Sequence, residues 1–169
     1  MLRSRRRIRP LTSSLALGLA LVVLAGPAAE AAGDNQWATV NICDTAKHPN
    51  GLGIRGRAPG NKTKQNIWMR FFAQFRRADG TWAQVQNGGV SPWVKLGTAD
   101  YTWRETGWTF FFNSLKPGQR IRLRGRVKIE YRKNGVVKRS ATEITEGGHH
   151  AAGDADPPGY SAATCVITG

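Results

Sequence analysis

The sequence predicts an all-β fold, specifically an antiparallel β-sandwich, from three observations. After residue 32, apolar and polar side chains alternate with a period of two, and helical periodicity is nearly absent. Turn-forming pairs such as Asn-Gly and Pro-Gly separate about eight such segments. The two cysteines, Cys43 and Cys165, lie near the two ends of this region. A small barrel is the alternative architecture, and the terminal cysteines favour the sandwich.

Residues 1–31 are predicted to be a cleaved signal peptide. Five arginines precede an apolar run, Leu15 to Ala25, which is too short for a permanent transmembrane helix. Ala29-Glu30-Ala31 fits an A-x-A cleavage site, so we expect the mature chain to start at Ala32, within three residues. An uncleaved anchor is the alternative. The segment Ser4-Arg5-Arg6-Arg7 partly resembles a twin-arginine signal, whereas the leucine-rich core is more typical of Sec export.

Export would place residues 32–169, a single domain, in an oxidising compartment outside the cell or at its envelope. Two lone thiols there are expected to form one disulfide, Cys43 to Cys165, between the first and last strands; two free thiols are the alternative. The chain has no C-x-x-C motif, which argues against a redox enzyme. We expect no transmembrane segment once the leader is removed.

The N-terminal half contains five expected strands, and the third alternates most clearly. Its odd-numbered residues from Ile67 to Phe75 share one face, which we expect to be buried, while Trp68 and Phe72 share the other. Turns are expected at Asn50-Gly51, Pro59-Gly60 and Ala78-Asp79-Gly80. The five strands are Trp37 to Cys43, Leu52 to Arg57, Ile67 to Arg76, Thr81 to Gln86 and Pro92 to Leu96.

The C-terminal half contains the remaining strands and the strongest hairpin signal. Asn134-Gly135 predicts a type I′ turn that places Lys133 opposite Val136. Continued along the strands, this register puts Glu130 opposite Arg139 and Arg126 opposite Glu143, two oppositely charged pairs that support it. A Gly-, Pro- and Asp-rich loop is expected at 146–159. The strands are Tyr101 to Phe112, Ile121 to Tyr131, one that follows Gly135, and Ser161 to Ile167.

Two segments resemble known proteins. Leu115-Lys116-Pro117-Gly118 and the alternation that follows to Val127 resemble the E–F corner and F strand of fibronectin type III and related immunoglobulin-like domains, with Ile121 in place of the usual tyrosine. This resemblance implies an immunoglobulin-like sandwich. The segments 43–50 and 156–165 are similar to the ends of small exported proteins of high-GC actinobacteria. That group has no assigned activity, so the similarity concerns fold and compartment only.

The charge of the chain indicates attraction to anionic polymers. The leader contains five of the 25 basic and one of the 11 acidic residues, which leaves the mature chain with a net charge of +10. Teichoic or uronic polysaccharides, anionic lipid surfaces and extracellular DNA would all be attracted. Such a charge also keeps many exported proteins soluble. Nucleic acid is not expected as a specific partner, and the oligomeric state is not predicted.

Two surface features are candidate binding sites. The first is a basic row spaced two residues apart along about 20 Å of one strand face; it consists of Arg122, Arg124, Arg126 and Lys128. Its alternative interpretation is a solvated face balanced by Glu130 and Glu143. The second is a candidate aromatic platform for sugar rings, Trp68 with Phe72, whose alternative is ordinary packing.

Catalytic and metal sites are not expected. His149 and His150 lie near Glu146, Asp154 and Asp156, but adjacent histidines rarely reach one ion. Motifs of serine hydrolases, zinc proteases and P-loop enzymes are absent. We therefore expect no cofactor and a non-enzymatic binding or structural role at the cell envelope or outside it. The alternatives are a carbohydrate-binding module for an extracellular polysaccharide and a small exported inhibitor or effector.

Overall fold

The computed structural model describes residues 35–169, in which there are nine β-strands and no helix. The predicted leader and its cleavage site lie outside the described residues. No helix in the described part of the chain could therefore cross a membrane. The strands are β1 (Trp37–Thr45), β2 (His48–Pro59), β3 (Asn66–Arg76), β4 (Trp82–Gln84), β5 (Val94–Thr98), β6 (Trp103–Phe111), β7 (Arg120–Lys133), β8 (Val136–Ile144) and β9 (Cys165–Thr168).

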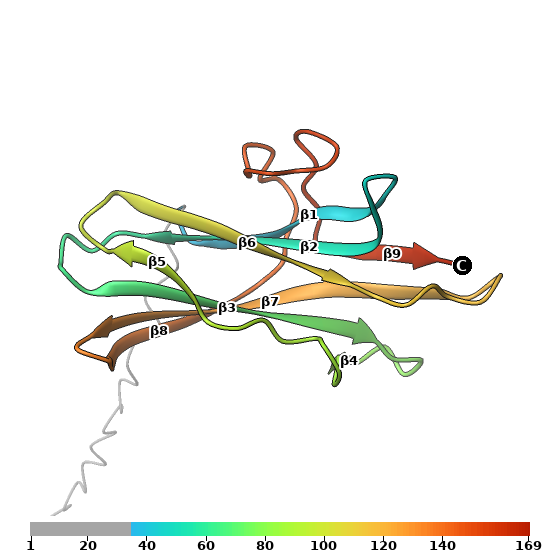
Figure 1. The fold of residues 1–169 in the computed structure, drawn as a ribbon, viewed down its shortest axis with the longest axis horizontal. Helices are drawn as coiled ribbons and strands as arrows, with labels where there is room; N and C mark the ends of the chain where they lie inside the picture. Colours follow the sequence, from blue (N-terminus) through green and yellow to red (C-terminus); the bar gives the residue numbers. More distant parts are fainter. Residues whose placement is uncertain (1–34) are drawn as a thin grey trace, which may run out of the picture. The chain divides into compact units, whose positions relative to one another are not determined.

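The strands form two antiparallel sheets packed face to face, which Figure 1 shows as an upper and a lower layer. The smaller sheet has the order β1-β2-β6. The larger has the order β4-β3-β7-β8, with β5 beside β3 and β9 beside β7. Immunoglobulin-like sandwiches place strands A, B and E in one sheet and C, F and G in the other. Here β1, β2 and β6 correspond to strands A, B and E, and β3, β7 and β8 correspond to strands C, F and G. The predicted sandwich is therefore confirmed.

The core lies between the two sheets and follows the predicted alternation. The odd-numbered residues of β3 from Ile67 to Ala73 are fully buried, and Phe75, at the end of the strand, is only partly buried. Within β7, a Cβ at Gly125 would lie 2.7 Å from Cδ1 of Ile54, so glycine is required for this close approach of the two sheets. The largest fully buried side chains are those of Leu52, Ile54, Ile67, Met69, Phe71, Leu123, Ile129, Tyr131 and Ile167.

The predicted disulfide is confirmed. Cys43 in β1 and Cys165 in β9 are bonded, with their Cα atoms 5.3 Å apart. Because β1 belongs to the smaller sheet and β9 pairs with β7 in the larger, the bond joins the two sheets as well as the first and last strands. A disulfide of this kind is compatible with an extracellular location.

The predicted register of the β7–β8 hairpin is correct only at the turn. Lys133 lies opposite Val136, but a register shift between Tyr131 and Arg132 adds one residue on β8. Glu130 therefore lies opposite Ser140 rather than Arg139, and Arg126 opposite Ile144 rather than Glu143. The two predicted charge pairs across the strands are wrong because a β-bulge changes which residues oppose each other.

The segment between β8 and β9 lies along the free edge of β1. Val40 and Ala162 exchange two backbone hydrogen bonds of 2.9 and 3.0 Å, and the amide of Asp156 donates to the carbonyl of Asn41. The last strand, predicted from Ser161, begins only at Cys165, because the preceding residues pair with β1 instead. This loop, red in Figure 1, thereby covers an edge strand that would otherwise present unpaired backbone groups.

Candidate functional site

The outer face of the larger sheet brings together the two features that the sequence suggested separately. Strand β7 contributes the basic row, and β3 runs beside it in antiparallel register. Phe72 lies directly opposite Arg126, and Trp68 lies opposite Glu130. Residues opposite each other in an antiparallel pair point to the same side, so the arginines and the aromatic rings share one surface.

Cations lie over aromatic rings along this surface. The guanidinium carbon of Arg126 is 4.3 Å from the ring centroid of Phe72, and that of Arg124 is 4.4 Å from the ring of Trp82. Arg132 lies 4.3 Å from Trp93. These distances are in the range of favourable cation–π contacts. We call this surface the arginine–aromatic face; it comprises Trp68, Arg70, Phe72, Trp82, Trp93, Arg124, Arg126, Lys128 and Arg132.

One acidic residue partly neutralises one end of this face. The carboxylate of Glu130 accepts from Lys128 Nζ at 2.8 Å and from Arg132 Nη2 at 2.6 Å, and its side chain is 6% exposed. Burial acts to raise the pKa of Glu130, but the hydrogen bonds from Lys128 and Arg132 outweigh it, so the pKa lies below its ordinary value. Glu130 therefore stays charged at neutral pH, and each of its two carboxylate oxygens is already paired with one of these cations.

The other end of the face has no carboxylate partner among residues 35–169. Arg124 donates to the neutral Oε1 of Gln74 at 2.9 Å, and desolvation lowers the pKa of its guanidinium, which still stays protonated at neutral pH. Arg126 makes no ion pair within residues 35–169, and Arg122 is exposed. Glu143, expected to balance Arg126, instead accepts a 2.6 Å hydrogen bond from Gln36.

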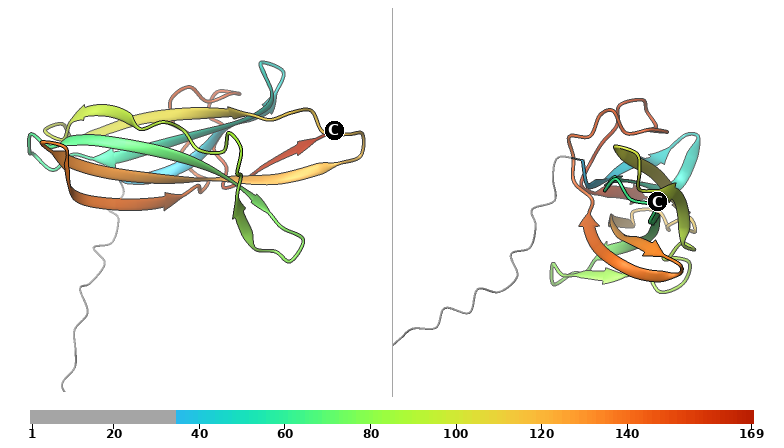
Figure 2. Two further views of the ribbon diagram at one scale, coloured as in Figure 1. Left: turned by 60° about the horizontal axis from the view of Figure 1, so that its bottom comes forward. Right: turned by 90° about the vertical axis from the view of Figure 1, so that its left-hand side faces the viewer.

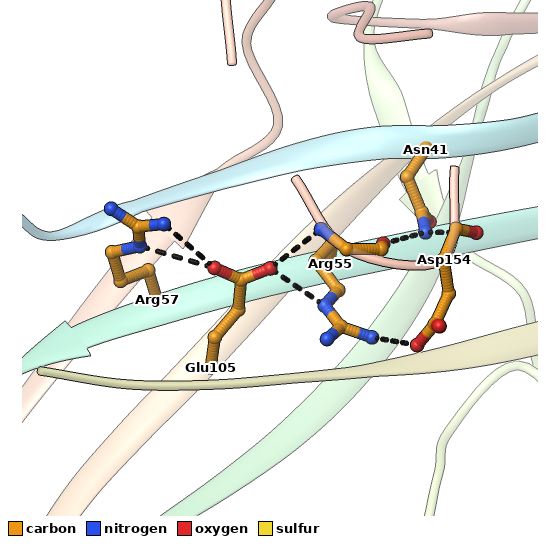
Figure 3. Close-up of polar contacts among 6 residues, drawn as sticks. Asn41, Arg55, Arg57, Glu105 and Asp154 are labelled. Atoms are coloured by element: carbon orange, nitrogen blue, oxygen red, sulfur yellow. Dashed lines mark hydrogen bonds and ion pairs between the residues drawn. The ribbon is translucent and has the colours of Figure 1, made fainter. Parts of the chain in front are cut away.

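A different polar cluster lies on the outer face of the smaller sheet, around Glu105 of β6 (Figure 3). One carboxylate oxygen accepts from Arg55 Nε and from the amide of Gly153, both at 2.9 Å. The other accepts from Arg57 Nη2 at 2.9 Å. Burial acts to raise the pKa of Glu105. The hydrogen bonds from Gly153, Arg57 and Arg55 act to lower it and outweigh the effect of burial, so the pKa lies below its ordinary value.

The Glu105 cluster attaches the loop that precedes β9 to the sheet. Arg55 also pairs with Asp154, with Nη1 and Oδ2 2.5 Å apart. Asn41 Nδ2 donates to the carbonyls of Gly153 and Asp154 at 3.1 and 3.0 Å, as Figure 3 shows for Asn41 and Asp154. Both carboxylate oxygens of Glu105 accept hydrogen bonds within this cluster. We therefore assign the cluster a structural role, which local sequence patterns do not reveal because its members lie about 50 or more residues apart.

The histidines are dispersed among separate contacts. His149 stacks on Trp37 with ring centroids 4.4 Å apart and faces Glu146 at 3.0 Å, and His150 faces the carbonyl of Gly159. His48 pairs with Asp156. Within residues 35–169 no group of three or more His, Cys, Asp or Glu side chains is placed to hold a metal ion.

A cavity of about 300 Å³ opens on the smaller sheet beside Trp108. Asn41, Arg55, Thr109 and Asp154 contribute polar groups to its lining. Residue Trp108 is 37% exposed. The cavity thus combines an accessible aromatic ring with hydrogen-bonding side chains.

Comparison with known proteins does not assign a function to any of these surfaces. No protein-family model, no curated protein and no solved structure matches the chain.

Proposed function

We propose that the protein is an exported, non-enzymatic binding protein that holds an anionic polymer of the cell envelope or the extracellular space on its arginine–aromatic face. The observation that carries the proposal is the unpaired end of that face. There, Arg124 and Arg126 lie on aromatic rings without a carboxylate partner among the described residues. Such groups are available to a ligand that supplies the missing negative charge.

The strand geometry suits a polymer better than a small ion. Side chains on one face of a strand repeat about every 6.6–7 Å, so the row on β7 offers several contacts to one extended chain. A guanidinium stacked on a ring can still donate through its Nη groups, and it loses little conformational freedom when a ligand binds. Each contact is weak and partly exposed to solvent, so we expect micromolar or weaker affinity that falls steeply with added salt.

The location is part of the proposal. The predicted signal peptide directs the chain out of the cell, and the Cys43–Cys165 disulfide is compatible with that environment. Outside the cell, anionic polymers such as teichoic acids and polyuronates are abundant and lie within reach of a basic protein. The net positive charge of the mature chain increases its rate of encounter with them.

The test is binding of secreted, disulfide-bonded protein to poly(glycerol phosphate), polygalacturonate and neutral dextran at low and physiological salt. The double variant Arg124→Glu/Arg126→Glu reverses both charges of the unpaired end, and we expect it to lose binding by about tenfold or more. The matched control is Lys133→Glu/Lys138→Glu, two exposed cations of the β7–β8 hairpin. Equal losses in both variants, or no binding by the parent protein, would refute the proposal.

A second candidate function is binding of a neutral polysaccharide at the cavity beside Trp108. The specific observation is an exposed indole next to the polar groups of Asn41, Thr109 and Asp154, since sugar rings stack on indoles and their hydroxyls need hydrogen-bond partners. A glycan array with the parent protein and Trp108→Ala tests it. Trp103→Ala, which removes another exposed indole of β6, is the control.

A further inference from the structure

Four arginines surround a second cavity, of about 270 Å³, at the end of the larger sheet where β7 begins. Its lining consists of Arg76, Arg77, Arg120, Arg122 and Val166. Strands β3, β7 and β9 meet here. Arg122 lies opposite Val166 of β9, and the pairing of Phe75 with Leu123 places the next residue of β3, Arg76, beside Arg122. The convergence of arginines thus follows from strand register rather than from nearness in the sequence.

This cavity continues the arginine–aromatic face. Gln74 lies opposite Arg124, so Arg76 and Arg122, two residues further along their strands, point to the same outer side. Arg124, which lies over Trp82, is therefore the neighbour of Arg122 along β7. An extended polymer bound along the face would therefore reach the cavity without bending.

The four guanidinium groups of the cavity have no hydrogen-bond or ion-pair partner in the described part of the chain. None of them forms a side-chain hydrogen bond or an ion pair there, and no carboxylate lines the cavity. Asp79 follows Arg77 in the turn after β3, but its Oδ1 accepts from the amide and hydroxyl of Thr81 at 2.8 and 2.7 Å. The positive charge of Arg77 contributes to the lowered pKa of Asp79, after the larger effect of Thr81. Apart from this interaction of Arg77 with Asp79, the positive charge of the cavity has no acidic partner among residues 35–169.

We propose that this cavity binds a phosphate group, and, resting on the function proposed above, that the polymer held by the face is one that carries phosphate. A carboxylate offers two oxygens and a single charge, which one arginine fork satisfies. A phosphate monoester carries a charge of about −1.5 to −2 and three acceptor oxygens. The phosphodiesters inside a polymer carry only one charge each, so the monoester is the group that four guanidinium groups match better than a uronate. The proposed ligand is an envelope polymer that ends in a phosphate monoester, with this terminal phosphate in the cavity and the adjoining polyol or sugar over Trp82.

The experiment uses the secreted protein and two sets of probes. Inorganic phosphate, pyrophosphate and galacturonate are titrated while the arginine side-chain N–H signals and the Val166 amide are followed by NMR. Poly(glycerol phosphate) chains that end in a phosphate monoester, polygalacturonate and double-stranded DNA are compared for polymer binding. We expect pyrophosphate and phosphate to bind about tenfold or more tightly than galacturonate, with shifts at the cavity arginines. Poly(glycerol phosphate) should bind more tightly than polygalacturonate.

Variants separate this proposal from the function on which it rests. Arg76→Gln/Arg120→Gln should abolish phosphate binding and the preference for poly(glycerol phosphate), whereas Lys133→Gln/Lys138→Gln should change neither. Equal binding of phosphate and galacturonate, or unchanged phosphate binding in the cavity variant, would overturn the phosphate site while polymer binding to the face still stands. Phosphate binding without any polymer binding would instead refute the function and the polymer assignment. Tighter binding of DNA would replace the envelope polymer with a nucleic acid.

Discussion

The guanidinium carbon of Arg126 lies 4.3 Å from the ring centroid of Phe72, its direct cross-strand partner. This contact determines how the cation is presented. Because the ring supports one face of the guanidinium, the side chain stays on the sheet instead of extending into solvent. Both strands are held by the core beneath them, so the spacing between neighbouring cations is set by the backbone. A surface built in this way loses little entropy when it binds an extended anion.

Phe71→Ala should destabilise the fold strongly. Phe71 is fully buried between the sheets, and its truncation leaves a cavity that costs about 3–5 kcal/mol in the free energy of unfolding. Chemical denaturation monitored by tryptophan fluorescence measures the cost. Phe72→Ala is the matched control, because Phe72 is the next residue on the outer side and should cost much less. Equal costs would mean that the two faces of β3 are assigned the wrong way round.

Loss of the disulfide should destabilise the fold by about 2–5 kcal/mol. Cys43 and Cys165 are 122 positions apart, so their bond removes many conformations from the unfolded chain. Melting of the parent protein with and without reductant, compared with Cys43→Ser/Cys165→Ser, tests this. Reductant should lower the melting temperature of the parent to that of the variant and leave the variant unchanged. A parent insensitive to complete reduction would contradict the prediction.

The strands could be predicted from the sequence because burial of one sheet face produces a period-two pattern. This held for β3, where the residues from Ile67 to Ala73 are buried as expected. The register between strands was less predictable. The Asn134-Gly135 turn correctly placed Lys133 opposite Val136, but the bulge after Tyr131 has no local signal and shifts every later pair by one residue.

The candidate site was only partly predictable for a related reason. The basic row and the pair Trp68 and Phe72 each follow from alternation within one strand. That Arg126 lies over Phe72 depends on pairing between β3 and β7, which the sequence of neither strand determines. The cluster around Glu105 was missed entirely, because its partners come from β2 and from the loop before β9. Contacts over such separations follow from the topology of the whole domain.

Tyr131→Phe should cost about 0.5–1.5 kcal/mol of stability. The side chain is fully buried, and its hydroxyl donates a 2.7 Å hydrogen bond to the carbonyl of Pro59, at the end of β2. Removing the hydroxyl keeps the ring and its packing, so the loss reports on that hydrogen bond alone. Tyr101→Phe, at a residue that is 60% exposed, is the control and should change the free energy of unfolding little. Equal values for the two variants would contradict the prediction.

The Glu105 cluster should make stability depend on pH in the acid range. The pKa of Glu105 is lower in the folded protein than its ordinary value, so the unfolded state binds a proton more readily. Its contribution to stability is therefore fully present above the unfolded pKa, at about pH 4.3, and is lost as the pH falls through the folded pKa. Glu130 acts in the same direction, because its pKa is also lowered.

Glu105→Gln isolates the contribution of this one carboxylate. At neutral pH the variant should be less stable than the parent by about 1.5–3 kcal/mol, since the charge-assisted hydrogen bonds to Arg55 and Arg57 are weakened. As the pH falls below about 4.3, the parent loses this advantage and the difference between the two should narrow. Tyr131→Phe is the control: burial raises the pKa of Tyr131, so the cost of that variant should stay constant over the same range. If the difference in stability between Glu105→Gln and the parent also stayed constant over this pH range, the carboxylate would not stabilise the fold through its charge.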